Sequence, residues 1–214
     1  MKYDVVIVAS GKGERAKLGY NKAFFKMKDG KTVLEHSISL FINDSDCEKV
    51  IVVTNEEYIS CVTKDNKVTT ALGGEQRKDS VYNGLKEVTC DHVLIHDAAR
   101  PFLNVESLND IKKQLENNDA VILAKKAIDT IKVVDGNKVV KTLDRNTIYM
   151  VETPQGFKTS LIKDCYEKCD NINFTDDASL VESLGYTVYV VEDKFDNKKL
   201  TTEMDFKNLW LKKL

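Results

Sequence analysis

Short apolar runs rich in β-branched residues alternate along this chain with segments of helical periodicity. The runs lie at residues 5–9, 50–53, 68–72, 93–95 and 120–124, and the helical patterns lie at 33–41, 80–88 and 105–115. A run that is apolar at every position is typical of a strand buried on both faces. The alternation predicts an α/β fold, a mostly parallel twisted sheet with helices on both faces.

The pattern changes after residue 127. Residues 128–149 alternate apolar and polar positions around Asp135-Gly136-Asn137, and Asp-Gly is a strong signal for a hairpin. A hairpin of this length predicts that residues 127–150 project as a β-arm that packs on a second subunit. A β-meander lying on the same domain is the alternative.

The remaining part of the chain returns to the α/β pattern. Helices are expected at 160–169, near 177–184 and from residue 203, with a strand at 187–191. Both prolines, Pro101 and Pro154, are expected at turns. No repeat or linker interrupts the chain, so residues 1–214 are predicted to form a single domain.

A glycine turn follows the first predicted strand. Ser10-Gly11-Lys12-Gly13 breaks the apolar run, and two glycines leave backbone N–H groups uncovered so that an anion can approach closely. Arg15 and Lys22 add cations directly after the turn. This order predicts a seat for a phosphate chain, and a solvated surface loop is the alternative.

Two better-known phosphate motifs fit this loop poorly. A Walker A loop is absent because Gly11-Lys12 is followed by glycine. Gly11, Gly13 and Ala16 formally match the dinucleotide fingerprint, which leaves a nicotinamide-dependent oxidoreductase as an alternative. That fingerprint expects a helix at once, whereas Leu18–Asn21 prolongs the loop.

Candidate site residues follow several of the predicted strands. Ligands of open α/β sheets bind at the carboxyl ends of the strands, and these segments could face one crevice. After the third run, Gly73-Gly74 offers bare backbone and Ser80 lies near a helix start, which suits the edge of a base or simply a turn and a helix cap. After the fourth, Asp97 suits a divalent metal beside phosphates and Arg100 suits a phosphate, unless the two form only a local ion pair.

Composition limits the partners and the compartment. The formal net charge of −2 gives no indication of a nucleic-acid or membrane surface, and no apolar stretch approaches the roughly 20 residues that span a bilayer. Asp4 interrupts the start, so a signal peptide is not expected. The five cysteines show no zinc or redox spacing, and reduced thiols in the cytoplasm are expected.

An ordered set of motifs resembles one known family. SGKGER followed by Lys22, then GGEQRKDSV, HDAARPF, DTIK, TLDR, ETPQGF, TDDAS and DNKKLT, resembles the motif series of the 2-C-methyl-D-erythritol 4-phosphate cytidylyltransferases of the non-mevalonate isoprenoid pathway. The resemblance covers nearly the whole chain. It implies a Rossmann-like nucleotidyltransferase fold, a homodimer joined by the β-arm, and Mg²⁺-dependent transfer of CMP from CTP to methylerythritol phosphate.

The resemblance also assigns roles to residues at matching positions. It implies that three cations contact the triphosphate and its α-phosphate, namely Arg15, Lys22 and Lys199. It implies nucleotide binding by Ala9, Ser10, Gly11, Gly13, Gly73, Glu75, Ser80 and Asp97, with Asp97 also on the metal side. It implies that the methylerythritol phosphate is bound by Arg100, Thr153 and Thr175, and by Thr130 and Arg145 reaching across from the partner's arm.

The chain departs from the family pattern at a few positions. Asn21 replaces the usual proline before Lys22, which predicts a less rigid loop, and Lys198 replaces an apolar residue before Lys199. Ser10 replaces an alanine and Glu75 stands where aspartate is frequent. Three alternatives remain: the nicotinamide-dependent oxidoreductase, a nucleotide-binding protein without turnover, and the sister ribitol 5-phosphate cytidylyltransferases, which tend to have Ser-Val in place of Ala98-Ala99.

Overall fold

A mixed sheet forms the centre of the molecule, seen in a computed structural model that describes residues 1–11, 13–169 and 173–211. Its strands lie in the order β3-β2-β1-β4-β8-β5-β9. Their bounds are β1 Tyr3–Val8, β2 Cys47–Thr54, β3 Val68–Leu72, β4 His92–Asp97, β5 Ala120–Lys126, β8 Tyr149–Lys158 and β9 Tyr189–Glu192. Only β8 runs antiparallel to its neighbours within this described sheet. The predicted α/β fold is therefore confirmed.

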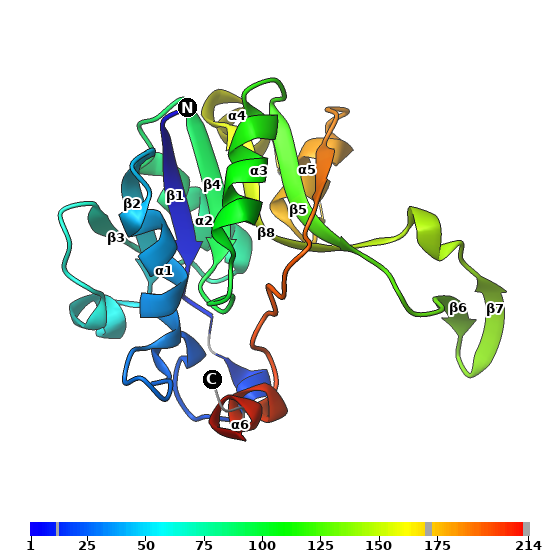
Figure 1. The fold of residues 1–214 in the computed structure, drawn as a ribbon. Coiled ribbons are helices and arrows are strands. Elements are labelled where there is room, and N and C mark those ends of the chain that lie inside the picture. The colour runs from blue at the N-terminus through cyan, green and yellow to red at the C-terminus, as the bar shows by residue number, and fades with distance from the viewer. Residues whose placement is uncertain (12, 170–172, 212–214) are drawn as a thin grey trace.

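Helices cover both faces of the sheet (Figure 1). The first face carries α1 Val33–Asn43 and α3 Val105–Leu115, and the second carries α2 Arg77–Lys86, α4 Thr159–Glu167 and α5 Asp177–Ser183. Side chains of a strand alternate between faces, so Val5 and Ile7 of β1 pack in the first core while Val6 packs in the second. Among the described helices, none is long and apolar enough to cross a bilayer.

The strand order places a topological switch point beside β1. The chain runs from β1 through β2 to β3, and then crosses to the other side of β1 to form β4. Val8 at the end of β1 is the register partner of Asp97 at the end of β4. A crevice for ligands opens outside the carboxyl ends of two strands at such a point.

The prediction that Pro154 lies at a turn is wrong, because this residue belongs to strand β8. Pro154 instead lies inside this ten-residue strand, between β4 and β5. The register of β5 and β8 shifts here, since Ile122 pairs with Gln155 while Ala124 pairs with Val151. A proline cannot donate a ladder hydrogen bond, and an irregularity of this kind is where a sheet accommodates one.

The predicted hairpin forms, but it is shorter than expected. Strands β6 Lys132–Asp135 and β7 Lys138–Thr142 pair in a two-stranded sheet of their own, and Tyr149 already begins β8. In Figure 1 the hairpin projects well away from the main sheet, as an arm and not as a meander laid on it. Its exposed side chains include Val134, Val139 and Val140. Whether a second subunit covers them stays a prediction.

Helix α6, Glu203–Leu211, packs beside the loop that follows β1. Phe206 of α6 and Leu200 before it share a small buried cluster with Ala16 and Val33. The C-terminal segment is therefore attached to the N-terminal loop. Short 3₁₀ helices complete the structure at Glu14–Ala16, Lys22–Phe24, Glu56–Cys61 and Arg145–Thr147.

Candidate active site

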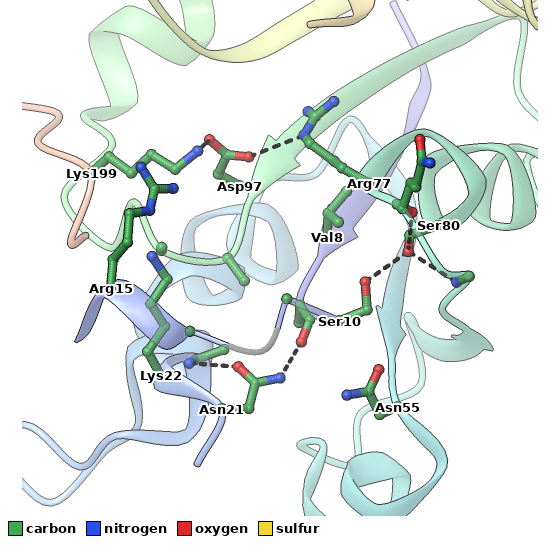
Figure 2. A pocket seen from close by; sticks show the side chains of 18 of the residues that line it. Val8, Ser10, Arg15, Asn21, Lys22, Asn55, Arg77, Ser80, Asp97 and Lys199 are labelled. Carbon is green, nitrogen blue, oxygen red and sulfur yellow. Dashed lines mark hydrogen bonds and ion pairs between the residues drawn. The ribbon is translucent and has the colours of Figure 1, made fainter. Parts of the chain in front are cut away.

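A cavity of about 1030 Å³ lies at the switch point, outside the ends of β1 and β4 (Figure 2). Segments from widely separated parts of the sequence line it. Those singled out from the sequence are Ala9, Ser10, Gly11, Gly13, Arg15, Lys22, Glu75, Ser80, Asp97 and Lys199. The structure thus brings most of the predicted nucleotide-side residues into one place.

The loop after β1 does not build the dinucleotide motif. Its described part turns directly into the 3₁₀ helix Glu14–Ala16, and no α-helix begins there. Gly13 has a φ of +69°, which disfavours other residues, and a Cβ at this position would lie 3.3 Å from the backbone nitrogen of Lys22. Ala16, the third fingerprint position, is buried against Phe206 and not at a helix start. The nicotinamide alternative loses its structural basis.

Asn21 anchors the second half of this loop. Its buried side chain donates a hydrogen bond to the carbonyl of Ala9 and accepts one of 3.0 Å from the N–H of Ala23, which caps the Lys22–Phe24 turn. Its own backbone N–H donates to the Tyr58 hydroxyl. The loss of the proline was predicted to leave a less rigid loop, but these three contacts tie the loop to β1 and to the 56–61 turn.

Cations from both ends of the chain converge on the cavity. Figure 2 shows the side chains of Arg15, Lys22 and Lys199 reaching toward the same space. The ammonium of Lys22 donates to the carbonyl of Leu200 at 2.7 Å, which joins the N-terminal loop to the C-terminal segment. Burial, together with the charges of Lys199 and Arg15, lowers the pKa of Lys22 to about 8. An arriving phosphate would relieve this repulsion.

Asp97 is the acidic centre of the site. Its Oδ2 lies 2.7 Å from the ammonium of Lys199 and 3.6 Å from Nε of Arg100, and its Oδ1 lies 3.7 Å from Nε of Arg77. Burial alone would favour the neutral acid, but Lys199, Arg77 and Arg100 hold the pKa of Asp97 well below its usual range. The carboxylate is therefore charged at neutral pH.

A hydrogen-bonded corner closes the other end of the cavity. The Ser80 hydroxyl accepts from the N–H of Gly74 at 3.0 Å, and Ser10 donates to it at 2.8 Å. Gly73 does not line the cavity but makes this corner possible, because a Cβ there would lie 2.4 Å from Cβ of Ser10. Glu75 is exposed at the rim. The corner offers backbone and hydroxyl groups of the kind that can pair with the edge of a base.

Two predicted substrate residues lie outside the cavity lining. Arg100 is buried. Its guanidinium donates a 2.7 Å hydrogen bond to the carbonyl of Asn197 and forms an ion pair with Asp97. Thr153 is also buried, and its hydroxyl accepts from the N–H of Asp97 and bonds to His96. In the described structure both support the strand end that carries Asp97. The local ion pair between Asp97 and Arg100, which was the alternative to their roles in binding metal and phosphate, is present.

The other predicted substrate residues stand apart from the cavity within the single chain. Thr130 and Arg145 lie exposed on the arm, where Nη1 of Arg145 donates to the carbonyl of Ile128. Thr175 is exposed next to α5, whose N-cap is Asp176. It borders a small second cavity of about 130 Å³ near Arg77.

Arg77 is a site residue that the sequence reasoning missed. It lines the cavity, pairs with Asp97, and places Nη2 2.8 Å from the fully buried Asp177. The position of Arg77 could have indicated its role, because it is the first residue of α2 and a cation is unfavourable at a helix N-terminus. Such a conflict with a local rule is expected where function requires the residue.

No group of three or more His, Cys, Asp or Glu side chains that could hold a metal occurs among the described residues. Among the residues that the structure describes, two carboxylates line the cavity, those of Asp97 and Glu75. Mg²⁺ commonly binds proteins through one or two carboxylates together with substrate phosphates. The donor set therefore fits a metal that arrives with a phosphate chain, and does not fit one held by protein alone.

Comparison with known proteins shows the family of the chain. The family model "IspD: 2-C-methyl-D-erythritol 4-phosphate cytidylyltransferase" matches residues 3–209. A protein of that name from Dictyoglomus thermophilum is 44% identical, over 96% of this chain and 93% of the relative, and one from Halalkalibacterium halodurans is 40% identical, over 96% and 94%.

Solved structures agree in fold. The crystal structure of the Francisella tularensis 2-C-methyl-D-erythritol 4-phosphate cytidylyltransferase has a TM-score of 0.84 and 32% identity, and covers 99% of each chain. A 4-diphosphocytidyl-2C-methyl-D-erythritol synthase from Anaerococcus prevotii has a TM-score of 0.86 and 28% identity, over 98% of each chain. The chain belongs to the 2-C-methyl-D-erythritol 4-phosphate cytidylyltransferase family.

Proposed function

We propose that this protein transfers CMP from CTP to 2-C-methyl-D-erythritol 4-phosphate, giving 4-diphosphocytidyl-2-C-methyl-D-erythritol and pyrophosphate. The observation that carries the proposal is the convergence of Arg15, Lys22 and Lys199 on one cavity beside Asp97. With Arg77, four cations line this cavity against two carboxylates in the part of the chain that the structure describes, and such an excess of positive charge suits a highly charged phosphate chain. Family membership supports the choice of CTP and of a polyol phosphate.

The reaction needs charge stabilisation more than proton transfer. A phosphate oxygen of methylerythritol phosphate attacks the α-phosphorus of CTP in line, a new P–O bond forms, and the bond from the α-phosphorus to the bridging oxygen breaks as pyrophosphate leaves. The nucleophile is already ionised at neutral pH, so no general base is required. Lys22, Lys199 and Arg15 neutralise the charge that develops on the α-phosphate and the leaving group.

The nucleoside would occupy the opposite end of the cavity. Ser10, Ser80 and the backbone of Gly74 would face a base there, and Asp97 would lie near the ribose side. Asp97 would hold Mg²⁺, which would supply further charge neutralisation. Lys199 already occupies Oδ2 of Asp97, so this chain's own cation competes for the same oxygen.

The polyol phosphate would be bound between two subunits. Thr130 and Arg145 lie on the projecting arm and contribute nothing to the cavity of their own chain. A homodimer joined through the arm would bring them to the partner's site, and would cover the exposed valines of β6 and β7. We place this enzyme in the cytoplasm.

Pyrophosphate release with CTP and Mg²⁺ tests the proposal, with methylerythritol phosphate and ribitol 5-phosphate offered in parallel. Release only with methylerythritol phosphate is expected. Release only with ribitol phosphate would keep the chemistry and move the protein to the sister activity. CTP binding without release from either substrate would favour a nucleotide-binding protein without turnover.

A further inference from the structure

A buried polar cluster adjoins Asp97 outside the cavity lining. It consists of Arg100, Glu152, Asp193 and Asn197, which are 8%, 9%, 4% and 0% exposed. Each has one buried side-chain atom without a hydrogen-bond partner: Nε, Oε2, Oδ2 and Oδ1. Six such atoms exist in the described residues, so four of the six gather here. Leaving buried polar groups unpaired is costly, and a cluster of them calls for an explanation.

The two carboxyl groups of the cluster account for two of the four unpaired atoms. Glu152 of β8 and Asp193, directly after β9, each leave one carboxylate oxygen buried without a partner, Oε2 and Oδ2, and Asp193 raises the pKa of Glu152. Asp193 already accepts from Ser107 at 2.8 Å and from the N–H of Phe195 at 2.9 Å, both through Oδ1. Ionised carboxylates only accept hydrogen bonds, so a proton held between the two groups is what would give both a partner.

The charges around Glu152 set how firmly that proton is held. Burial and the neighbouring Asp193 raise the pKa of Glu152 to about 7, against the opposing charges of Arg100 and Lys125. Lys125 faces the pair from β5 and donates to the carbonyl of Phe195 at 3.1 Å. Nη1 of Arg100 lies 3.7 Å from Oε1 of Glu152, longer than a hydrogen bond.

Arg100 connects this pair to the site. Its Nη1 donates a 2.7 Å hydrogen bond to the carbonyl of Asn197, two residues before Lys199. The side chain of Asn197 in turn donates to the carbonyl of Thr153 at 2.7 Å. The same guanidinium lies 3.6 Å from Asp97. A shift of Arg100 toward Glu152 would therefore change both the segment that carries Lys199 and the charge balance of Asp97.

We propose that Glu152 is a positioning residue for cytidylyl transfer: its protonated form, bonded to Asp193, leaves Arg100 on Asn197 and Asp97, and so keeps Lys199 available to the phosphates. When Glu152 loses its proton, the new charge draws Arg100 away, and Asp97 then holds Lys199 more tightly. This inference rests on the proposed function and concerns its regulation by pH.

The test compares kcat/KM for CTP between pH 6 and 9 in wild type, Glu152→Gln, Glu152→Leu and the control Glu192→Gln. Glu192 is the exposed carboxylate next to Asp193 on β9. Gln keeps the shape of Glu152 and cannot ionise, so the ratio of Glu152→Gln to wild type should rise from about one at pH 6 to about three at pH 8.5, within the range of coupling between contacting residues. Comparing ratios cancels the ionisation of the substrates and of Lys22.

The leucine variant separates positioning from simple packing. Glu152→Leu removes the proton donor, which leaves Asp193 as an unpaired negative charge near Arg100, and kcat/KM should therefore fall at every pH. Glu152→Gln keeps a donor for Asp193 and should retain activity, and Glu192→Gln should follow wild type throughout. Thermal unfolding of each variant shows that the protein is folded. A constant ratio of Glu152→Gln to wild type across the range would overturn the inference, as would wild-type activity in folded Glu152→Leu. Turnover by the wild-type protein supports the proposed function whichever result the variants give.

Discussion

The ammonium of Lys199 lies 2.7 Å from Oδ2 of Asp97, although the two residues belong to the C-terminal segment and to the end of a central strand. The segment is held there by its backbone, since the N–H of Leu200 donates to the carbonyl of Ala99 at 2.8 Å and Lys22 donates to the carbonyl of Leu200. The cation site therefore exists only once both ends of the chain have folded around β1 and β4.

Replacing Lys199 by alanine should lower kcat by about 10²- to 10³-fold, the loss typical of a removed charge-stabilising donor. The neighbouring Lys198 is the matched control, because it is also a lysine but pairs with Asp205 at 2.6 Å on the surface. Lys198→Ala should retain kcat within a few-fold. Steady-state pyrophosphate release measures both. Similar losses in the two variants would show that the segment's fold, and not the Lys199 charge, matters.

The activity should decline as the pH rises through about 8, because the pKa of Lys22 is lowered to about 8 by burial and by Lys199 and Arg15. The charged form is the active one, so its contribution is complete below this pH and is lost above it. Bound triphosphate stabilises the charged form, and the inflection should therefore appear in kcat/KM for CTP and be weaker in kcat. Lys22→Arg, which stays charged, should lose this inflection and keep only the smaller, about threefold decline that Glu152 contributes. An unchanged inflection in that variant would assign the titration to another group.

Substituting Gly73 by alanine should impair nucleotide binding directly, and not only through a loss of folding stability. The added Cβ would lie 2.4 Å from Cβ of Ser10, so the hydrogen bond between Ser10 and Ser80 would be displaced. We expect KM for CTP to rise by about tenfold, equivalent to about 1.4 kcal/mol. The neighbouring Leu72, whose side chain is exposed, gives the control Leu72→Ala. Equal KM values for the two variants would contradict the role of the corner.

Mixed dimers test whether the arm completes a partner's site. A chain with Arg145→Ala has an intact cavity, and a chain with Lys22→Ala has an intact arm. Random mixing of equal amounts makes half of the dimers mixed, each with one complete site, so about one quarter of wild-type activity should return. Activity that stays at the level of the separate variants would show that each site is built from one chain.

The sequence predicted those parts of the fold that local patterns encode. Continuous apolar runs such as Val50–Val53 marked buried strands, and the 3.6-residue period of Val105–Leu115 marked a helix. Strand β8 was not predicted because Pro154 and Gly156 lie inside it, and both residue types are depleted in strands. Its position between β4 and β5 is decided by tertiary packing, which no short window of sequence contains.

The sequence likewise predicted some residues of the candidate site and missed others. Residues at or just beyond the end of a strand, such as Asp97 and Ser10, could be placed in the cavity because parallel strands end at one edge. Arg77 could not, since its role depends on Asp97 and Asp177 meeting it from other elements. The burial of Arg100 likewise depends on Asn197 and Glu152, which are distant in sequence.

The product of the reaction tests the central claim most directly. Phosphorus NMR of a mixture of enzyme, CTP, Mg²⁺ and methylerythritol phosphate should show pyrophosphate and a diphosphate diester appearing in equal amounts. That diester joins the α-phosphorus of CTP to the phosphate of the polyol, as in-line attack among Arg15, Lys22 and Lys199 requires. Formation of CMP or CDP in its place, or pyrophosphate release without the polyol phosphate, would contradict the account.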